Sequence, residues 1–461
     1  MISICNTTRL RQSSVSFTRN AGDEDIVCCP RTGGCTVFRK AWSILEEITR
    51  NWIDVREITL AVARKHNSTT DDVADGVKYV ISELAGQRFV EIRTVANDDV
   101  RRDGMTFSSD ICISRNIAKD DNVDRVTPLG AFYMRHGLPG ELHIDLTDGC
   151  NERCVHCYLP KGGANFIDTN VARKVLKEFR DAQGLTVFIS GGECMLHKDF
   201  ATILRYAKSL DLNIIVLSNL TMCDAEIVNL LKEVDPQFVN VSLYAVEETI
   251  HDSITQVRGS CRKTKDAIDA LQSAGVHVRI ATPFMRENRN CVDELRAYAA
   301  AHRVHLIADC EIFGQIDHSC ANQSHALSMT ELADLVSQNK DIFARECYKP
   351  HECASGAKVC DIGDFRLNLD AEGKFYPCDG FHGAIIGDAQ KDSLWDVWTG
   401  EPLNKLRRLK NRDFGACADC SNRAWCKVCP MRNFNETGSM FTHAAWRCDA
   451  ARLYRRIYEE K

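Results

Sequence analysis

The chain has 461 residues, 44% of them hydrophobic, and its 58 basic and 64 acidic side chains give a formal net charge of −6. This length allows about two to four domains with a sizeable core. A partner that needs a basic face is excluded by the charge, so we expect neither nucleic acid nor an anionic membrane as a partner. The sequence has no apolar run of the roughly 18 residues that a membrane span needs, and it starts without the apolar stretch of a signal peptide. We therefore expect a cytoplasmic protein.

The chain is rich in cysteine, with 23 cysteines in total. In the cytoplasm, clustered cysteines more often hold metal than form disulfides. Eight of them lie within residues 353–448 and three within residues 150–157. Scattered cysteines, such as Cys112, Cys223 and Cys310, are interpreted as small buried hydrophobic residues. The two dense groups are therefore the candidate metal-binding regions.

Residues 1–95 are predicted to form a small independent domain. Their pattern predicts a hairpin around "RTGG", then helices over residues 40–49, 54–67 and 69–87, then a closing strand over residues 88–95. A hairpin, three helices and a strand in this order indicate a winged-helix-like domain. Residues 96–135 are polar and irregular, and we expect them to be a linker.

Residues 136–345 alternate between strand and helix patterns. Strands are predicted in "LHIDLT", "LTVFIS", "NIIVLSN", "FVNVSLY", "VHVRIATPF" and "RVHLIADCEIF", and helices around residues 169–182, 198–210, 224–233, 262–274 and 291–302. Six βα units in series predict an α/β fold with a parallel sheet and right-handed crossovers. A doubly wound sheet is one solution. We favour a partial (β/α)6 barrel of the TIM type, because the residues suited to chemistry follow the C-terminal ends of the strands.

Residues 346–461 break into short segments rich in cysteine and glycine. Too little apolar sequence remains for an ordinary core, so we expect bound metal to hold this C-terminal domain together. Its dense cysteines are Cys353, Cys360, Cys378, Cys417, Cys420, Cys426, Cys429 and Cys448. The stretch "CADC…CKVC" also has the spacing of a zinc ribbon, which is the alternative to iron–sulfur clusters.

The stretch "GCNERCVHCY" follows the first predicted barrel strand and contains three cysteines, Cys150, Cys154 and Cys157. Cysteine thiolates usually hold all four irons of a [4Fe–4S] cluster, so three cysteines leave one iron free for another ligand. A zinc site completed by His143 or His156 is the alternative that the residues leave open.

The CxxxCxxC spacing resembles that of the radical S-adenosylmethionine (SAM) superfamily, and the resemblance covers roughly residues 140–320. It implies that the free iron binds SAM, and that SAM cleavage yields a 5′-deoxyadenosyl radical that abstracts hydrogen. The second strand ends in Gly191, Gly192 and Glu193, which resemble the GGE motif of this family. There the glycines let the backbone approach SAM and the acid meets its ammonium. A strand-to-helix turn also favours glycine for geometric reasons alone.

Polar residues at the next two strand ends extend the resemblance. Ser218 and Asn219 end the third strand, where the family places groups on the ribose or methionine part of SAM. Ser242 lies in the fourth strand and would meet the SAM carboxylate, and Arg258 resembles an arginine that follows this strand. The two serines are otherwise ordinary strand-end residues, and Arg258 is otherwise a solvated loop charge.

The C-terminal cysteines resemble the SPASM extension of radical SAM enzymes, which carries two auxiliary [4Fe–4S] clusters. Carried over by position, the first cluster would use Cys353, Cys360, Cys378 and Cys429, and the second Cys417, Cys420, Cys426 and Cys448. Two residues separate Cys426 from Cys429 where three are usual, Cys347 competes with Cys353, and some relatives leave that fourth position open. Asp379 matches an aspartate that serves as general base in sulfatase-maturing relatives, although a solvated turn acid would look the same.

The N-terminal domain resembles the RiPP recognition element, a winged-helix domain that grips the leader of a ribosomally made precursor peptide. The leader would pair with an open sheet edge near residues 26–38, beside the helix at 70–85. A DNA-reading winged helix is the alternative, but Asp71, Asp72 and Asp75 at the start of that helix would repel phosphate.

The three resemblances together imply a radical SAM peptide maturase of the sactipeptide or ranthipeptide type, which joins a cysteine sulfur to a carbon of another residue. They imply SAM and three [4Fe–4S] clusters as cofactors, with a precursor peptide and an electron donor such as flavodoxin or ferredoxin as partners. The alternatives are a carbon–carbon crosslinking maturase or a peptide epimerase, and less favoured are an anaerobic sulfatase maturase and a non-enzymatic redox sensor. The sequence does not identify the peptide, the carbon attacked or the number of bonds.

Overall fold

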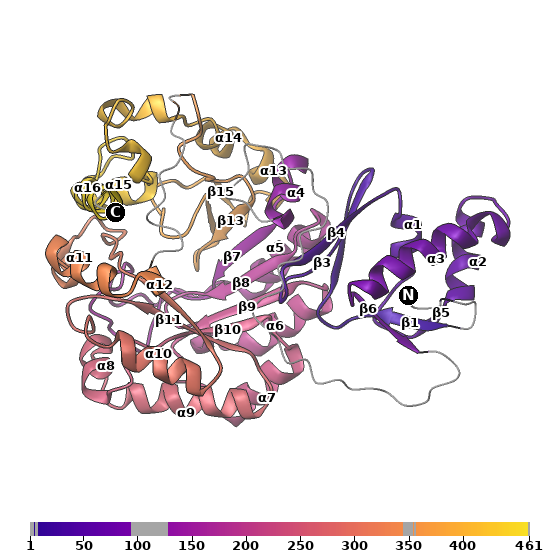
Figure 1. Ribbon diagram of the computed structural model, residues 1–461, viewed down its shortest axis with the longest axis horizontal. Coiled ribbons are helices and arrows are strands. Elements are labelled where there is room, and N and C mark those ends of the chain that lie inside the picture. The colour runs from indigo at the N-terminus through magenta and orange to yellow at the C-terminus, as the bar shows by residue number, and fades with distance from the viewer. Residues whose placement is uncertain (1–3, 5–7, 94–127, 344–353, 355, 460–461) are drawn as a thin grey trace. The chain divides into compact units, whose positions relative to one another are not determined.

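The computed structural model describes residues 4, 8–93, 128–343, 354 and 356–459 (Figure 1). The chain divides into two compact units, unit 1 (Met1–Leu138) and unit 2 (Pro139–Lys461). Each unit has its own buried apolar core. None of the helices in the described ranges is both long enough and apolar enough to cross a bilayer.

Unit 1 contains two three-stranded antiparallel sheets, with strand orders β2-β3-β4 and β5-β1-β6. The strands are β1 (Arg9–Gln12), β2 (Phe17–Ala21), β3 (Glu24–Cys29), β4 (Gly34–Arg39), β5 (Ile53–Asp54) and β6 (Val90–Arg93). The predicted hairpin is present as β3 and β4, with Cys29 opposite Gly34. β1 and β2 were not predicted, and β2 pairs with one edge of β3. Among the described residues, the hairpin therefore keeps its open edge along β4.

The helices of unit 1 are α1 (Trp42–Leu45), α2 (Val55–Lys65), α3 (Thr70–Gly86) and α4 (Pro128–His136). α3 begins with a capping box in which Thr69 and Asp72 exchange side-chain and backbone hydrogen bonds. Leu10, Val27, Ile58 and Ile81 contribute to a core shared by the helices and both sheets. The three predicted helices are therefore observed, and the winged-helix assignment stays a prediction.

α4 lies within the stretch that we expected to be linker. It buries Phe132 and Tyr133, and both Arg135 and His136 contact Glu24 of β3, at 2.8 and 3.0 Å. The hydrogen bond from His136 lowers the pKa of Glu24. The end of the expected linker is thus a helix of unit 1, and residues 94–127 lie outside the described residues.

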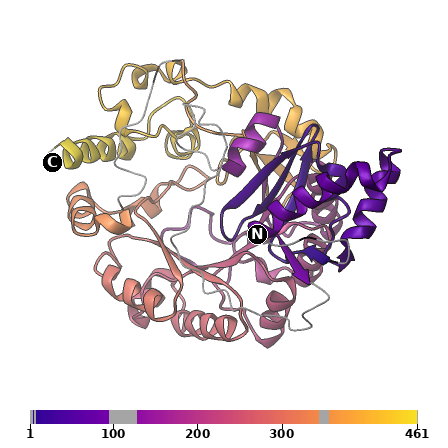
Figure 2. The same cartoon turned by 45° about the vertical axis from the view of Figure 1, so that its right-hand side comes forward.

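Unit 2 is built on a nine-stranded sheet with the order β12-β11-β10-β9-β8-β7-β13-β14-β15. Six parallel strands match the six predicted ones: β7 (Glu141–Asp145), β8 (Thr186–Ser190), β9 (Asn213–Ser218), β10 (Phe238–Ser242), β11 (Val278–Pro283) and β12 (His305–Asp309). The sheet and its covering helices give an α/β fold consistent with a partial TIM-like barrel (Figures 1 and 2).

The remaining three strands come from the C-terminal region and continue the same sheet. β13 (Arg366–Leu369) pairs in parallel with β7, and β14 (Lys374–Tyr376) and β15 (Gly387–Asp388) follow as an antiparallel extension. Leu367, Phe375 and Trp398 are buried in the same core as the barrel strands. The expectation that this region lacks an apolar core was therefore wrong for its first half, because that half shares the core of the barrel.

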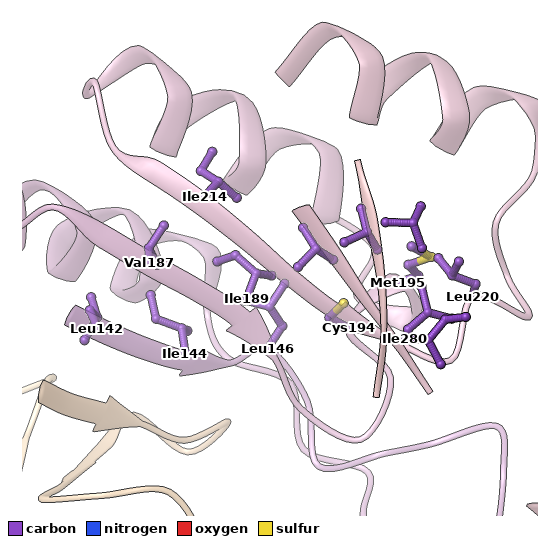
Figure 3. Close-up of a cluster of buried hydrophobic side chains, with 14 of the residues drawn as sticks. Leu142, Ile144, Leu146, Val187, Ile189, Cys194, Met195, Ile214, Leu220 and Ile280 are labelled. Carbon is purple, nitrogen blue, oxygen red and sulfur yellow. The ribbon is translucent and has the colours of Figure 1, made fainter. Parts of the chain in front are cut away.

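The helices of unit 2 follow the predicted alternation, and α8, α11, α12, α15 and α16 were not predicted. They are α5 (Thr169–Asp181), α6 (Phe200–Ser209), α7 (Ala225–Val234), α8 (Glu248–Thr255), α9 (Ser260–Ser273), α10 (Val292–Ala301), α11 (Met329–Gln338), α12 (Lys340–Phe343), α13 (Leu394–Thr399), α14 (Glu401–Arg407), α15 (Pro430–Thr437) and α16 (Ala445–Glu459). Leu142, Ile144, Val187 and Ile189 pack beside one another in the core of the barrel (Figure 3). Cys310 is buried in this core, as predicted, whereas Cys223 is only half-buried against it, and Cys112 lies outside the described residues.

Candidate active site and cluster-binding cysteines

The three cysteines of the first motif lie on the cysteine loop, which we define as residues 146–168 between β7 and α5. The loop is fixed to the C-terminal end of α8, because Arg153 N donates to Thr255 O and Val155 N to Ile254 O, both at 2.9 Å. Cys150 is exposed, whereas Cys154 and Cys157 are half-buried. The protein backbone therefore sets the path of the loop that carries the thiols.

The three thiols are close enough to influence one another electrostatically. Burial raises the pKa of Cys150 to about 12, and Cys157 adds to this rise. Burial also raises the pKa of Cys154 well above its usual value, with further contributions from Cys157 and Cys150. Iron ions would supply the positive charge that converts such thiols into thiolates, so the donor set fits a cluster. Within the described ranges, no three Cys, His, Asp or Glu side chains converge on a single ion, and a four-iron cluster does not require this because each thiolate binds a different iron.

The two glycines of the GGE motif are explained by the close approach of the cysteine loop. Gly191 has a φ of +133°, and a Cβ atom there would lie 2.2 Å from Thr147 O. A Cβ atom on Gly192 would lie 2.2 Å from Gly149 O. Gly192 N donates to Thr147 O at 2.8 Å, which joins the end of β8 to the loop. Only glycine leaves room for this backbone-to-backbone contact.

Glu193 is buried at the centre of a hydrogen-bond network that joins two strand ends. Its carboxylate accepts hydrogen bonds from Ser218 Oγ at 2.9 and 3.0 Å, from Asn219 N at 2.9 Å and from Met195 N at 3.0 Å. Burial raises the pKa of Glu193, and these hydrogen bonds oppose the rise. Asn219 Nδ2 lies 3.8 Å from Cys150 Sγ. The structure thus brings Glu193, Ser218 and Asn219 together beside the cysteine loop.

The two other predicted SAM contacts have different surroundings. Ser242 ends β10 and is hydrogen-bonded to the hydroxyl of Tyr244, which lies 3.8 Å from Cys154 Sγ. Arg258 is exposed between α8 and α9, and nothing in the described part of the chain links it to the other predicted residues. Ser242 therefore belongs to the surroundings of the cysteine loop, and the role of Arg258 stays a prediction.

A buried polar chain beside the loop was missed by the sequence analysis. Glu152, inside the "CNERC" stretch, is hydrogen-bonded to Ser260 and lies 3.6 Å from Cys154 Sγ. His251 Nε2 lies 3.3 Å from Ser260 Oγ, and all three side chains are buried. Burial raises the pKa of Glu152 to about 7. The only signal in the sequence was the position of Glu152 within the cysteine motif, because burial of a charged residue leaves no local pattern.

Asp379 is paired rather than freely solvated. Its Oδ1 lies 3.2 Å from His143 Nδ1, and His143 Nε2 lies 3.3 Å from Asp145 Oδ1. Burial alone would lower the pKa of His143, but Asp379 and Asp145 raise it to about 9. These groups line a small pocket together with Tyr158, Asn368, Cys378 and His382. The pocket lies between the cysteine loop, which contributes Tyr158, and Cys378 of the C-terminal region. His143 therefore faces carboxylates rather than the cysteines.

The C-terminal cysteines form two groups in the structure. Burial raises the pKa of Cys378 well above its usual value, and Cys429 and Cys360 raise it further, so these three thiols are neighbours. Burial likewise raises the pKa of Cys448, with contributions from Cys417 and Cys420. Cys426 joins this second group, because Cys448 and Cys417 add to the rise of its pKa to about 11. Cys353 and Cys347 lie outside the described residues.

Three buried hydrogen-bond donors beside these cysteines have no acceptor among the residues that the structure describes. Arg423 Nε, Trp446 Nε1 and Arg447 Nε are buried without a hydrogen-bond partner in the described part of the chain. Buried polar groups normally have partners, and the sulfides and thiolates of an iron–sulfur cluster accept hydrogen bonds. The residues present therefore fit bound iron–sulfur clusters.

Comparisons with known proteins agree with this chemistry. Residues 144–299 match the radical SAM superfamily, and residues 360–421 match the SPASM iron–sulfur cluster-binding domain. The chain is 23% identical to an AdoMet-dependent heme synthase of Methanosarcina barkeri, over 64% of this chain and 92% of that protein. It is 26% identical to the antilisterial bacteriocin subtilosin biosynthesis protein AlbA of Bacillus subtilis, over 68% of this chain and 74% of that protein.

A solved structure resembles nearly the whole chain. SuiB of Streptococcus suis, bound to the precursor peptide SuiA, superimposes with a TM-score of 0.60 at 15% identity, over 95% of this chain and 99% of that one. This likeness concerns the fold. It extends beyond the parts of the chain that match the two sequence families.

Proposed function

Because the chain carries a radical SAM domain followed by a SPASM domain, we propose that it is a maturase of a ribosomally made precursor peptide. We propose that it joins a cysteine sulfur of that peptide to a carbon of another residue. The single observation that supports a peptide substrate is the similarity of fold, over 95% of the chain, to SuiB bound to its precursor peptide. The heme synthase resembles 64% of this chain, so the catalytic domains alone do not select the substrate.

In this proposal three residues of the cysteine loop, Cys150, Cys154 and Cys157, hold a [4Fe–4S] cluster with SAM on its free iron. When bound, the cluster and SAM supply the one-electron chemistry that removes a hydrogen atom from the peptide. The protein positions these groups. Glu193, held in place by Ser218 and Asn219, presents negative charge to the SAM ammonium.

The pocket around Asp379 supports the thioether chemistry. A peptide cysteine must lose its thiol proton before its sulfur forms a bond to carbon. Asp379 lies next to Cys378 and is held by His143 at 3.2 Å, so its carboxylate is positioned to accept that proton at a site between the cysteine loop and the C-terminal cysteines. We propose that Asp379 is the general base and that His143 orients it.

Unit 1 is proposed to bind the leader of the precursor by adding a strand to an open sheet edge. The sheet order leaves the β4 edge, Gly34–Arg39, available within the described residues, because β3 is already paired on both sides. The sequence suggested an edge near residues 26–38, and we propose that the leader binds along β4 within that range. SPASM clusters held by the two C-terminal cysteine groups would accept the electron that is released when the peptide thiolate bonds to the carbon radical, and a flavodoxin or ferredoxin would supply the electron that cleaves SAM.

Mass spectrometry of the precursor peptide encoded beside this protein, after anaerobic co-expression, tests the proposal. We expect a loss of a pair of hydrogens for each bond, with cysteines that no longer alkylate after reduction. The same mass loss with free cysteines would indicate a carbon–carbon crosslinker instead. An unchanged mass with deuterium taken up from heavy water would indicate an epimerase. An unmodified peptide, from protein with its clusters intact, would contradict the proposed maturase.

A further inference from the structure

Four charged side chains, one buried and three half-buried, join the end of the barrel to the two C-terminal helices. We call them the arginine–glutamate cluster: Glu311, Arg432, Glu436 and Arg447. Glu311 follows β12, and its carboxylate lies 2.5 Å from Arg447 Nη1 and 3.3 Å from Arg432 Nη1. Arg432 Nε lies 2.6 Å from Glu436 Oε1. One carboxylate of the barrel therefore holds both arginines of the C-terminal region.

The cluster is enclosed by protein. The side chain of Arg432 is 0% exposed and that of Arg447 is 16% exposed. Arg432 lies over the ring of Trp446, with 4.2 Å from its guanidinium carbon to the ring centre, and it donates to Ile312 O at 3.0 Å. In such surroundings solvent screens charge weakly, so these groups act on their neighbours more strongly than surface charges do.

Two charges of each sign would balance one another without any further function. The guanidinium of Arg447 is only partly hydrogen-bonded. Its Nη1 donates to Glu311, but its buried Nε has no acceptor among the described residues. A buried, unpartnered N–H of a cation costs free energy. It indicates a site where an acceptor binds.

Arg447 is connected to cysteines of both C-terminal groups. It directly precedes Cys448, which belongs to the second group. Glu311 joins Arg447 to Arg432. The backbone N of Arg432 donates a hydrogen bond to the sulfur of Cys429, which belongs to the first group, at 3.4 Å. Arg447 therefore lies where its charge can act on both groups.

We infer that Arg447 is a tuning residue shared by the two auxiliary clusters, that its guanidinium favours their reduced forms, and that Glu311 fixes it in that position. This inference rests on the proposed function, which places a cluster on each cysteine group. A cluster becomes more negative when it gains an electron, so a buried cation beside its thiolates raises its reduction potential. Glu311 has the opposite sign and lowers the potential, although it also orients the arginine.

Redox titration of the full-length, iron-loaded protein, followed by electron paramagnetic resonance, tests this inference. The Cys150→Ala, Cys154→Ala, Cys157→Ala background leaves only the C-terminal clusters to be observed. In it, we expect Arg447→Gln to move both potentials to more negative values and Arg447→Lys to move them less. Arg456→Gln is the matched control, because Arg456 is exposed on the same helix α16, and it should leave both potentials unchanged.

Glu311→Gln distinguishes an effect of charge on the cluster potentials from an effect of disturbed structure. It removes a negative charge and should move both potentials in the direction opposite to that of Arg447→Gln. Iron content per chain and melting temperature identify variants that fold and load. Unshifted potentials in loaded Arg447→Gln protein, or shifts of the same sign in both variants, would overturn the inference. A wild-type C-terminal region that binds no iron would overturn the proposed auxiliary clusters as well, so the two failures are distinguishable.

Discussion

The cysteine loop of the barrel and the second cysteine group of the C-terminal region are held by different means. The loop packs against the large core of unit 2, and backbone hydrogen bonds from β8 and α8 fix its path. Three cysteines of the second group, Cys417, Cys420 and Cys426, lie on or beside the short 3₁₀ turns η3 (Asn411–Cys417) and η4 (Arg423–Trp425). The fourth, Cys448, lies on α16. In the described part of the chain, the small core beside the turns has three buried residues, Val359, Phe414 and Val428. The path of the first region is therefore set by the protein itself. We expect the second region to depend on the proposed cluster for its stability.

The largest expected effect comes from substituting one cysteine in each region and comparing the two variants. Cys154→Ala should abolish SAM cleavage while leaving the free energy of unfolding within about 0.5 kcal/mol, because the loop keeps its backbone anchors. Cys420→Ala should instead lower the stability of residues 409–429, because it removes a proposed ligand from a segment with a small core. The measurements are 5′-deoxyadenosine formation by chromatography and limited proteolysis of the iron-loaded protein.

The result would contradict the comparison if Cys154→Ala were as sensitive to protease as Cys420→Ala. Cys310→Ala offers a control that removes a buried thiol from the barrel without touching either cysteine group. It should retain SAM cleavage.

A second prediction concerns the fit between β8 and the cysteine loop. Gly191→Ala would place a Cβ atom 2.2 Å from the carbonyl oxygen of Thr147, at a residue with a φ of +133°. Backbone must then move, and we expect a loss of about 3 kcal/mol in the free energy of unfolding, together with loss of iron from the loop. Urea unfolding measures the first effect and iron quantification the second.

Gly275→Ala is the matched control, because Gly275 also has a positive φ but no atom within 4 Å of an added Cβ. It should cost only about 1 kcal/mol and leave iron binding unchanged. Equal losses in the two variants would show that backbone conformation, and not contact with the loop, explains the glycine.

A third prediction concerns the junction of the two regions, where His143 of β7 contacts Asp379. The pKa of His143 is raised to about 9 from an ordinary 6.5, so its stabilising effect is complete below pH 6.5 and is lost as the pH rises through about 9. The side chain is only 10% exposed, and the contribution is of the order of 3 kcal/mol. Urea unfolding between pH 6 and pH 10 should show this decline, and His143→Asn should flatten it.

His318→Asn provides the comparison for this pH dependence, because His318 is an exposed histidine of the same unit. The decline should survive this substitution. A wild-type curve that is flat over the same range would show that the His143 charge does not stabilise the junction.

The smallest expected effect tests how firmly the extension is joined to the barrel sheet. Arg366 of β13 donates to Glu141 of β7 through Nε at 2.8 Å and through Nη2 at 2.5 Å. A double-mutant cycle with Glu141→Gln and Arg366→Met should give a coupling of roughly 1 kcal/mol. The exposed pair Lys177 and Asp181 on α5 should give roughly 0.5 kcal/mol or less. A coupling no larger than that of the exposed pair would weaken the view that the two regions share one sheet.

Local patterns in the sequence were enough to predict much of unit 2. Strand and helix periodicity placed all six barrel strands, and the cysteine spacing located the loop after β7. The pairing of β13 with β7 was not predictable, because more than 200 residues separate the partners Glu141 and Arg366. The apolar residues of β13 and β14 are too few to indicate that they complete the core of a distant sheet.

The candidate site was predictable only where chemistry requires a motif. The cysteines, the glycines and Glu193 stand in recognisable patterns. Glu152, Ser260 and His251 form one buried chain from three separate segments, and no spacing rule connects them. Likewise the resemblance suggested a general base at Asp379, but the sequence does not show that His143 lies next to it. Contacts of this kind depend on the fold, and they determine the charge and orientation of the predicted groups.

The most direct test of the account follows SAM and the peptide in one reaction. Reduced, iron-loaded protein is incubated with SAM and the full precursor peptide, and 5′-deoxyadenosine and peptide mass are measured together. The account predicts 5′-deoxyadenosine in step with the loss of hydrogen pairs from the peptide, with both absent in Cys154→Ala. 5′-Deoxyadenosine that forms while the peptide stays unmodified, or a peptide modified equally by Cys154→Ala, would contradict it.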